Sequence, residues 1–262
     1  PRAAVSANRI DEVLNEKSSI RDPENPERLE EHKGVVSFNH VSFRYPNADA
    51  DVLSDIDFVA KPGETTAIVG STGCGKSTLI NLIPRLYDAT QGSVLVDGHD
   101  VKNITMEDLR SEIGYVPQKG VLFSGTIASN LRYGKDDATD AQIEEAASIA
   151  QATEFIDSKS AKYDSPIAQG GTNVSGGQKQ RLSIARAIAK DPKIYIFDDS
   201  FSALDLKTEA DLYSELSAKK YDVTRIIIAQ RIASVKNADR IVVMDNGRLA
   251  DVGSHSELIK TS

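Results

Sequence analysis

A glycine-rich segment in the first third of the chain has the residue types and the spacing that phosphate binding requires. Residues Gly70 to Thr78 read GSTGCGKST and match the pattern G-x-x-x-x-G-K-[ST]. The glycines allow backbone N–H groups to curl around phosphates, Lys76 can reach the β- and γ-phosphates, and the Ser77 hydroxyl can hold magnesium. The apolar run Thr65–Val69 predicts a strand before this loop, and the residues from Ser77 onward (STLINLIPRLY) predict a helix after it. We therefore expect a nucleoside triphosphate to bind here.

Two further segments carry groups that act together with a phosphate loop. Such a loop needs an acidic residue at the end of a neighbouring buried strand as a second metal ligand, and Asp198 directly follows the apolar run Ile194–Phe197. The segment Val174–Ala187 reads VSGGQKQRLSIARA, in which Ser175 is an expected helix N-cap and the next two glycines allow an anion to approach the backbone. A capped core helix is the plain alternative for this segment, but the phosphate loop 99 residues upstream favours the functional interpretation.

The composition limits the classes of function. Apolar residues make up 40% and charged residues 27% of the 262 residues, which is ordinary for a globular protein with a buried core. The formal net charge of −8 argues against a basic face that grips nucleic acid. No run of about 18 apolar residues predicts a membrane span. The one cysteine, Cys74, excludes an internal disulfide, and a small residue tolerated in the loop explains it better than redox chemistry does.

The patterning predicts an α/β fold with an antiparallel region and a helical insert. The C-terminal segment RIVVMDNGRLADVG predicts a hairpin that turns at Asn246-Gly247. Further strands are expected over Val35–Phe43, Val52–Ala60, Gly92–Gly98, Ile194–Phe197 and Arg225–Ala229, the last two in a buried parallel sheet. Further helices are expected over Ser6–Glu16, over Thr139–Ile156 with a capping box of Thr139 and Gln142, and over Ser175–Lys190.

Together these motifs resemble the nucleotide-binding domain of ATP-binding-cassette (ABC) transporters. GSTGCGKST is similar to the Walker A motif of that family, IYIFD to Walker B, VSGGQ to the signature and SALD to the D-loop. VPQ places Gln118 at the Q-loop glutamine, and FRYP places Tyr45 at the A-loop aromatic that stacks on adenine. The resemblance runs from about Val35 to Lys260. It implies a P-loop NTPase core of mixed or parallel sheet with helices, an antiparallel β subdomain, an α-helical subdomain, and the cofactors ATP and Mg²⁺.

The resemblance also assigns residues to each part of the site. ATP binding falls to Tyr45, Gly70, Ser71, Thr72, Gly73, Cys74, Gly75, Lys76, Ser77 and Thr78. The signature, which serves the ATP of a partner domain, comprises Val174, Ser175, Gly176, Gly177 and Gln178. The D-loop comprises Ser202, Ala203, Leu204 and Asp205, and the metal ligands are Ser77, Gln118 and Asp198.

Within the family, the segment QKGVLFSGTIASNLRYG after Gln118 resembles exporters of the multidrug and peptide type. The resemblance implies that residues 1–34 are a linker from a transmembrane domain of the same full-length protein, and that residues 35–262 are the ATP-binding domain, with a helical subdomain at about 119–190. It implies a location at the cytoplasmic face of the plasma membrane, the fragment itself being soluble, and no nucleic-acid partner. It also implies head-to-tail dimers that close on ATP and open after hydrolysis.

Three positions depart from the family pattern. The residue after Asp198, normally a glutamate that orients or deprotonates the attacking water, is Asp199, whose carboxylate is retracted by roughly 1.5 Å. The residue after the strand RIIIA, normally the switch histidine at the γ-phosphate, is Gln230, which can donate a hydrogen bond but cannot protonate. Pro166 replaces the glutamate expected in the loop SPIAQGG, so contacts of this loop with a membrane domain are expected to differ.

The first two departures fall in the same half-site, and catalytic groups that act as a unit fail together. The resemblance assigns catalysis to Asp199, Gln230, Gln118 and Lys76, so we expect this site to bind ATP and to hydrolyse it slowly. The signature is nearly intact, which favours a heterodimer whose second, different domain supplies the glutamate and the histidine.

Three other classes of protein share part of this pattern. A non-catalytic clamp that holds ATP and regulates its partner is consistent with the same residues. A DNA-repair or chromosome-maintenance ATPase would need a coiled coil for which the 99 residues between Lys76 and Ser175 leave no room. A translation-type factor would carry two cassettes, and one is present. The sequence does not indicate a transported substrate.

Overall fold

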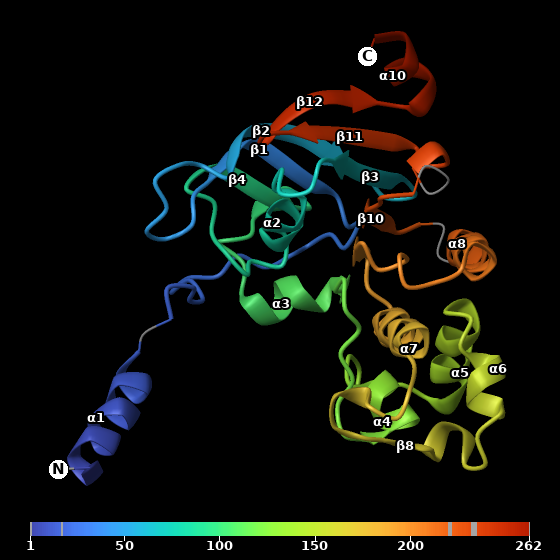
Figure 1. Cartoon of the computed structure of the whole chain (residues 1–262). Coiled ribbons are helices and arrows are strands. Elements are labelled where there is room, and N and C mark those ends of the chain that lie inside the picture. Colours follow the sequence, from blue (N-terminus) through green and yellow to red (C-terminus); the bar gives the residue numbers. More distant parts are fainter. Residues whose placement is uncertain (1, 17, 220–221, 232–234, 262) are drawn as a thin grey trace.

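The structure is a computed structural model that describes residues 2–16, 18–219, 222–231 and 235–261. Residues 1, 17, 220–221, 232–234 and 262 belong to the predicted segments 1–34 and 35–262 but lie outside the described residues. Two sheets and a group of helices make up the body of the chain (Figure 1). The predicted α/β class, with an antiparallel part and a helical part, is confirmed.

The central sheet has six strands in the order β12-β11-β3-β10-β9-β6, and all neighbours are parallel except the edge pair β11 and β12. Its strands are β3 (Thr65–Gly70), β6 (Ile113–Val116), β9 (Ile194–Asp198), β10 (Thr224–Ile228), β11 (Arg240–Asp245) and β12 (Arg248–Gly253). The strands predicted from the apolar runs are confirmed. β6 was not predicted, because four residues give too short a pattern to be read as a strand.

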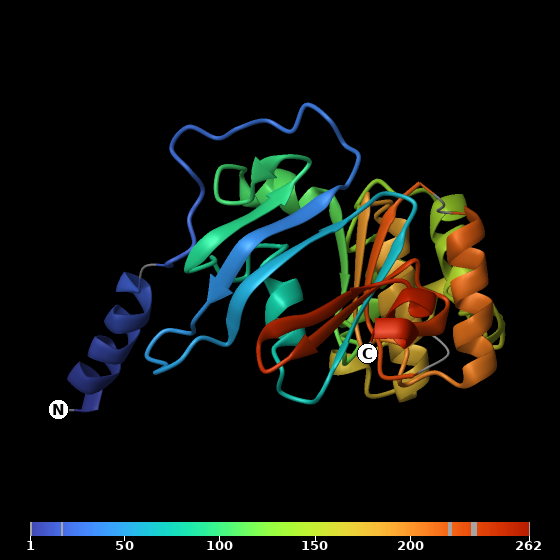
Figure 2. The same cartoon turned by 90° about the horizontal axis from the view of Figure 1, so that it is seen from above.

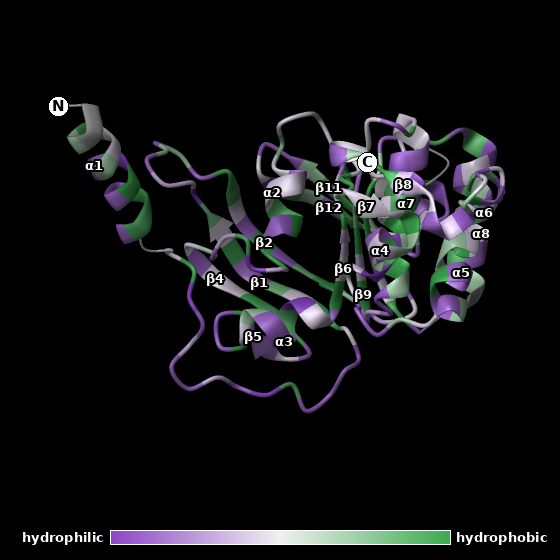
Figure 3. Ribbon diagram, turned by 90° about the horizontal axis from the view of Figure 1, so that it is seen from below, coloured by the Kyte–Doolittle hydropathy of each residue, from purple (hydrophilic) through white to green (hydrophobic). Residues whose placement is uncertain are grey.

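The central strands are buried on both faces, as expected for a parallel sheet covered on both sides. Successive side chains of a strand point to opposite faces. Ile194 and Ile196 accordingly join one hydrophobic core, and Tyr195 and Phe197 join the other. The first core lies against the antiparallel sheet, and the second lies against the helices. Figure 3 shows this apolar interior as green strands between more polar peripheral elements.

The second sheet has four strands in the order β2-β1-β4-β5 and is antiparallel throughout. Its strands are β1 (Val36–Phe43), β2 (Leu53–Ala60), β4 (Gln91–Val96) and β5 (His99–Asp100). Phe38 and Phe58, which are cross-strand partners, stack with ring centroids 4.8 Å apart. A small two-stranded sheet pairs β7 (Gly125–Thr126) with β8 (Pro166–Ile167), in which Pro166 is exposed and Ile167 is buried.

The helices divide into a group beside the central sheet and others placed singly. The group at the lower right of Figure 1 contains α4 (Ile127–Arg132), α5 (Asp140–Ile149), α6 (Thr153–Asp157) and α7 (Gly176–Ala189), with α8 (Leu206–Lys219) next to it. The remaining helices are α1 (Arg2–Asn15), α2 (Lys76–Asn81), α3 (Met106–Ser111) and α10 (His255–Thr261). In the described residues, no helix is long and apolar enough to cross a membrane.

Two predicted helices are shorter than expected. The helix predicted over Thr139–Ile156 keeps its capping box but ends at Ile149, because Gln151 adopts a left-handed φ of 56° and the chain restarts as α6. The helix predicted from Ser77 to Tyr87 ends at Asn81. Pro84 has no N–H to continue it, and the next residue, Arg85, has a φ of 52°.

The N-terminal segment approaches the body along the antiparallel sheet. Helix α1, predicted over Ser6–Glu16, projects away from the rest of the chain in Figures 1 and 2, and its apolar Ile10 and Val13 are exposed. Residues after it are tied down. The Asp22 carboxylate accepts a hydrogen bond from the Met106 N–H at 2.7 Å, which caps the start of α3. The Glu27 carboxylate lies 2.8 Å from the His99 ring nitrogen.

The C-terminal hairpin is fixed to β2 through its turn. Asn246 and Gly247 have φ values of 46° and 77°, the pattern of a type I′ turn predicted from Asn-Gly. The Ser54 N–H donates to the Gly247 carbonyl at 2.8 Å. A Cβ at Gly247 would lie 2.3 Å from the Val52 carbonyl oxygen, so this close contact between the two sheets requires glycine.

We predict that Gly247→Ala lowers the free energy of unfolding by about 2–4 kcal/mol, because it adds a backbone clash to left-handed strain. Gly98 is the matched control, since it follows Asp97 (φ 50°) with a φ of 86° but a Cβ there would meet nothing within 4 Å. Gly98→Ala should cost only the strain, about 1 kcal/mol. Urea unfolding of both variants measures the difference, and equal losses would contradict the clash.

Candidate nucleotide site

The predicted phosphate loop lies between the end of β3 and the start of α2. Gly70, Gly73 and Gly75 have φ values of 152°, 84° and 98°, which side-chain-bearing residues rarely adopt. A Cβ at Gly70 would lie 2.3 Å from the Met244 carbonyl oxygen, and one at Gly75 would lie 2.8 Å from Leu53. These glycines are therefore required by the geometry of the loop itself.

Lys76 bends back over the loop, and its ammonium donates to the Gly70 carbonyl at 2.8 Å and to the Ser71 carbonyl at 2.7 Å. A cavity of about 490 Å³ is lined by Lys76 and the start of the phosphate loop, and also by Gln230 and His255. This volume is in the range of small-molecule and cofactor sites. The cavity thus places one positive charge and the loop backbone in front of any phosphate group that enters.

Asp198 is held next to the phosphate loop by two hydroxyl groups. The Ser77 hydroxyl donates to Asp198 Oδ1 at 3.0 Å. The Tyr115 hydroxyl lies 3.0 Å from Asn81 Oδ1 and 3.4 Å from Asp198 Oδ2. Burial raises the pKa of Asp198, against the lowering effect of these hydrogen bonds and of the Lys76 charge, and burial likewise raises the pKa of Tyr115. A hydroxyl and a carboxylate at this separation are suitable oxygen ligands for Mg²⁺.

Asp199 binds two glutamine side chains through one oxygen. The Gln230 amide donates to Asp199 Oδ2 at 2.7 Å, and the Gln118 amide donates to the same atom at 3.2 Å. Asp199 is 7% exposed and has a left-handed φ of 47°. Burial raises the pKa of Asp199, and the neighbouring Asp198 charge also raises it, whereas the hydrogen bond from Gln118 lowers it. The three residues are thus joined, although they come from three separate segments.

Tyr45 reaches the loop from the antiparallel sheet. Its hydroxyl lies 3.0 Å from the Thr78 hydroxyl, and its ring makes edge contacts with Phe43 and Tyr87 at centroid distances of 4.8 and 5.2 Å. The half-buried ring therefore stands beside the first turn of α2, where an aromatic ring is in reach of a base attached to phosphates in the loop.

The predicted signature begins α7. Ser175 and Gln178 form a reciprocal capping box: the Gln178 N–H donates to the Ser175 hydroxyl at 3.2 Å, and the Ser175 N–H donates to the Gln178 side-chain carbonyl at 3.0 Å. A Cβ at Gly176 would meet nothing within 4 Å, so the backbone at this helix start is open. Among the described residues, those that line the cavity at the phosphate loop include none from Val174–Gln178.

The D-loop connects Asp199 to α8. The Ser202 hydroxyl donates to the Asp199 carbonyl at 2.9 Å. At the other end, Asp205 caps α8 by accepting a hydrogen bond from the Thr208 N–H at 2.9 Å. The D-loop is therefore bonded to Asp199 at one end and caps α8 at the other.

A family model described as ABC transporter matches residues 53–202, which is more than half of the chain. The chain belongs to the ABC transporter family. An uncharacterized ABC transporter ATP-binding protein of Mycobacterium tuberculosis is 48% identical over 99% of this chain and 45% of its own length. A Staphylococcus aureus protein assigned by name to multidrug export, as an ATP-binding/permease protein, is 42% identical over 95% of this chain and 43% of its own length.

A bacterial Atm1-family ABC exporter solved with ATP bound has a TM-score of 0.93 and 36% identity over 99% of this chain and 45% of its own. The chain thus spans about half the length of the relatives it matches. The predicted recognition of an ABC ATP-binding domain is confirmed, and ATP is the ligand of this domain family.

In this ABC domain, the predicted residues fall into three groups. Lys76, Ser77 and Asp198 meet at the phosphate loop, and Asp199, Gln118 and Gln230 meet beside it. Gln118, predicted as a metal ligand, contacts Asp199 in the structure, and the signature forms a third, separate group. Sequence reasoning missed Tyr115, because a tyrosine in an unpredicted strand carries no local sign that its hydroxyl faces Asp198.

We predict that Tyr115→Phe raises the Mg²⁺ concentration for half-maximal ATP binding by about threefold to tenfold, because one hydrogen bond that orients a charged ligand is lost. A fluorescent ATP analogue titrated with Mg²⁺ measures this, and binding of the analogue in EDTA should be unchanged. Tyr133→Phe is the control, since Tyr133 is 63% exposed and stacks on Phe123. An unchanged Mg²⁺ requirement would show that Tyr115 does not hold the ligand.

Proposed function

We propose that this ABC domain is the ATP-driven motor of an exporter and that its own nucleotide site hydrolyses ATP slowly. The export role is supported by the name of the Staphylococcus aureus relative and by the Atm1-family exporter, both about twice as long as this chain. In this proposal residues 1–34 are the linker from a transmembrane domain, residues 35–262 are the motor, and about 119–190 are its helical subdomain. The motor lies at the cytoplasmic face of the plasma membrane.

In the proposed site, the phosphate loop and Lys76 bind the phosphates, and Tyr45 stacks on adenine. Ser77, Asp198 and Gln118 are the residues that would hold Mg²⁺, which would offset the phosphate charge. The support is the adjacency of Lys76 to the cavity and the 3.0 Å contact of Ser77 with Asp198. Lys76 would have to exchange its two loop carbonyls for phosphate oxygens, which is favourable because those oxygens carry charge.

The observation that carries the slow-hydrolysis proposal is the pair of amides on Asp199 Oδ2. A general base must present a free lone pair to the proton that it removes, within hydrogen-bond distance of the water. Asp199 is one methylene shorter than glutamate, and two N–H donors already occupy one of its oxygens. A misplacement of about 1 Å costs about 100-fold in rate. Gln230 has no titratable proton near neutral pH to replace the missing histidine.

The signature of this chain is proposed to complete the site of a second, different ABC domain in a head-to-tail dimer. Its support is the open backbone at Gly176 and the position of the signature outside the cavity at this chain's own loop. ATP held between the two domains would close them, and hydrolysis at the partner's site would reopen them. Export would follow from this cycle through the transmembrane domain.

A second function, an ATP-holding clamp that never hydrolyses, is favoured by the same contacts of Asp199. Single-turnover hydrolysis with and without the partner domain separates the two, because a slow motor releases phosphate at this site and a clamp does not.

We predict that this chain alone turns over ATP well below about 1 per second, the low end of ordinary enzymes, and that Asp199→Asn changes this little. The double variant Asp199→Glu, Gln230→His should raise turnover at least about tenfold, because it restores the longer carboxylate and a titratable ring. Steady-state phosphate release measures both, and ATP affinity is the control. Fast turnover in the unmodified chain would reject the slow site.

We predict that Gly176→Ala leaves stability and ATP binding by this chain unchanged, since a Cβ there meets nothing within 4 Å. In the assembled full-length transporter the same variant should lower ATP hydrolysis at least about tenfold, because the methyl group stands between the signature backbone and the partner's nucleotide. Phosphate release and thermal unfolding measure the two effects. Full activity in the assembly would contradict the role of the signature.

A further inference from the structure

Arg231, the residue after Gln230, binds the D-loop and α8 at the same time. Its Nη2 donates to the Ser202 carbonyl at 3.1 Å and to the Leu204 carbonyl at 2.9 Å. Its Nη1 pairs with the Glu209 carboxylate on the first turns of α8. The Glu209 side chain is 8% exposed and the Arg231 side chain 32%, so the carboxylate of the pair is shielded from water and the arginine remains partly exposed. Three elements therefore converge on one guanidinium group.

The contacts of Arg231 connect this chain's own nucleotide site with its signature. On one side, Arg231 is covalently next to Gln230, which bonds Asp199 in this chain's own site. On the other side, the two carbonyls that Arg231 binds flank Ala203. The Ala203 carbonyl oxygen lies 3.4 Å from the position of a Cβ on Gly177, in the signature. Gln230 is therefore covalently next to the residue that binds the D-loop, and the D-loop lies beside the signature at Gly177.

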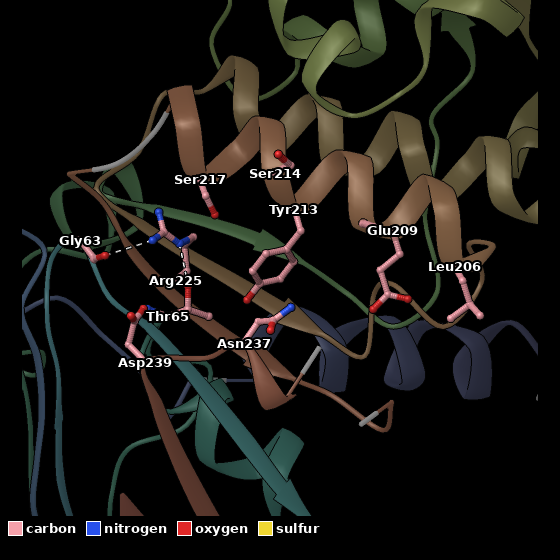
Figure 4. Close-up of a pocket in the computed structure, with 11 residues that line it drawn as sticks. Gly63, Thr65, Leu206, Glu209, Tyr213, Ser214, Ser217, Arg225, Asn237 and Asp239 are labelled. Carbon is pink, nitrogen blue, oxygen red and sulfur yellow. Dashed lines mark hydrogen bonds between the residues drawn. The ribbon is translucent and has the colours of Figure 1, made fainter. Parts of the chain in front are cut away.

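Helix α8 borders a cavity on one side and packs into the hydrophobic core on the other. Figure 4 shows Glu209 and Tyr213 of α8 facing Thr65 and Arg225 across a pocket, and the cavity there has a volume of about 460 Å³. The opposite face of α8 is anchored by the buried Leu212. Glu209 lines the pocket, so its bond to Arg231 holds the helix where side-chain packing is incomplete.

We propose that Arg231 is a positioning residue that couples the nucleotide held by this chain to its own signature, and through it to the partner's nucleotide. The inference rests on the proposed function. When Gln230 leaves Asp199 for the γ-phosphate, Arg231 moves with it and carries Ser202 to Leu204 along. The signature then takes the position that the partner's ATP requires. The forked guanidinium is needed because it binds two carbonyls and a carboxylate together.

The experiment uses the full-length protein assembled with its partner and compares Arg231→Ala with the unmodified protein. We expect kcat for ATP hydrolysis to fall at least about tenfold, while the affinity of this chain for a fluorescent ATP analogue stays within about twofold. The Leu204 amide, bonded to the Phe201 carbonyl, should exchange hydrogen faster, whereas the Leu79 amide in α2 should not change. Arg248→Ala, at an exposed arginine, is the matched control and should leave kcat unchanged.

A kcat within about twofold of the unmodified value overturns the proposal, and so does an equal fall in ATP affinity, which would indicate a general structural role. If Arg231→Ala does not fold, Arg231→Lys is measured instead; it keeps the charge but not the fork and should lose at least about threefold in kcat. An active assembly in which Gly176→Ala has no effect rejects the proposed signature role and this coupling together. An assembly sensitive to Gly176→Ala but insensitive to Arg231→Ala rejects the coupling alone.

Discussion

The parallel pairing of the central strands is the constraint on which the site depends. β10 pairs with both β3 and β9, and Ile228 is the register partner of Ile68 on one side and of Asp198 on the other. Parallel strands in register end at the same edge of the sheet, so the segments that follow them emerge together. The phosphate loop follows β3, Asp198 ends β9 and Asp199 follows it, and Gln230 follows β10. A one-residue slip of this register would turn the side chains of a strand to the opposite face of the sheet, so the meeting of residues around Asp199 depends on it.

This convergence brings two carboxylates together away from water, and each is stabilised by a different set of hydrogen-bond donors. Asp198 is half-buried and the adjacent Asp199 is buried, and the partial removal of water raises the pKa of each, since it disfavours a carboxylate. Asp198 is stabilised by the hydroxyls of Ser77 and Tyr115, which are neutral and can also stand beside a metal ion. Asp199 is stabilised by the side-chain amides of Gln118 and Gln230. An amide NH₂ group donates hydrogen bonds to a carboxylate and carries no charge itself.

Much of this fold and site could be predicted from the sequence, where a signal is local. Apolar runs, the glycine loop, and the Asn-Gly hairpin depend on nearest neighbours along the chain, and each is confirmed. The break of the helix at Gln151 and the early end of α2 could not be predicted as well, because a left-handed residue without glycine has no strong pattern. The contact partners of Tyr115 and Arg231 come from distant segments, so only the folded chain places their polar groups beside Asp198 and the D-loop.

The two departures from the family pattern are best understood as one bonded pair. A 2.7 Å hydrogen bond joins Gln230 to Asp199, and the left-handed φ of Asp199 turns its short side chain toward that partner. The Gln230 amide donates to a buried carboxylate, and a buried polar group without a hydrogen-bond partner costs free energy. The pair therefore lowers the cost of keeping a buried carboxylate. In the proposed function the same bond keeps that carboxylate from acting as a base, so stability and slow chemistry are both assigned to one contact.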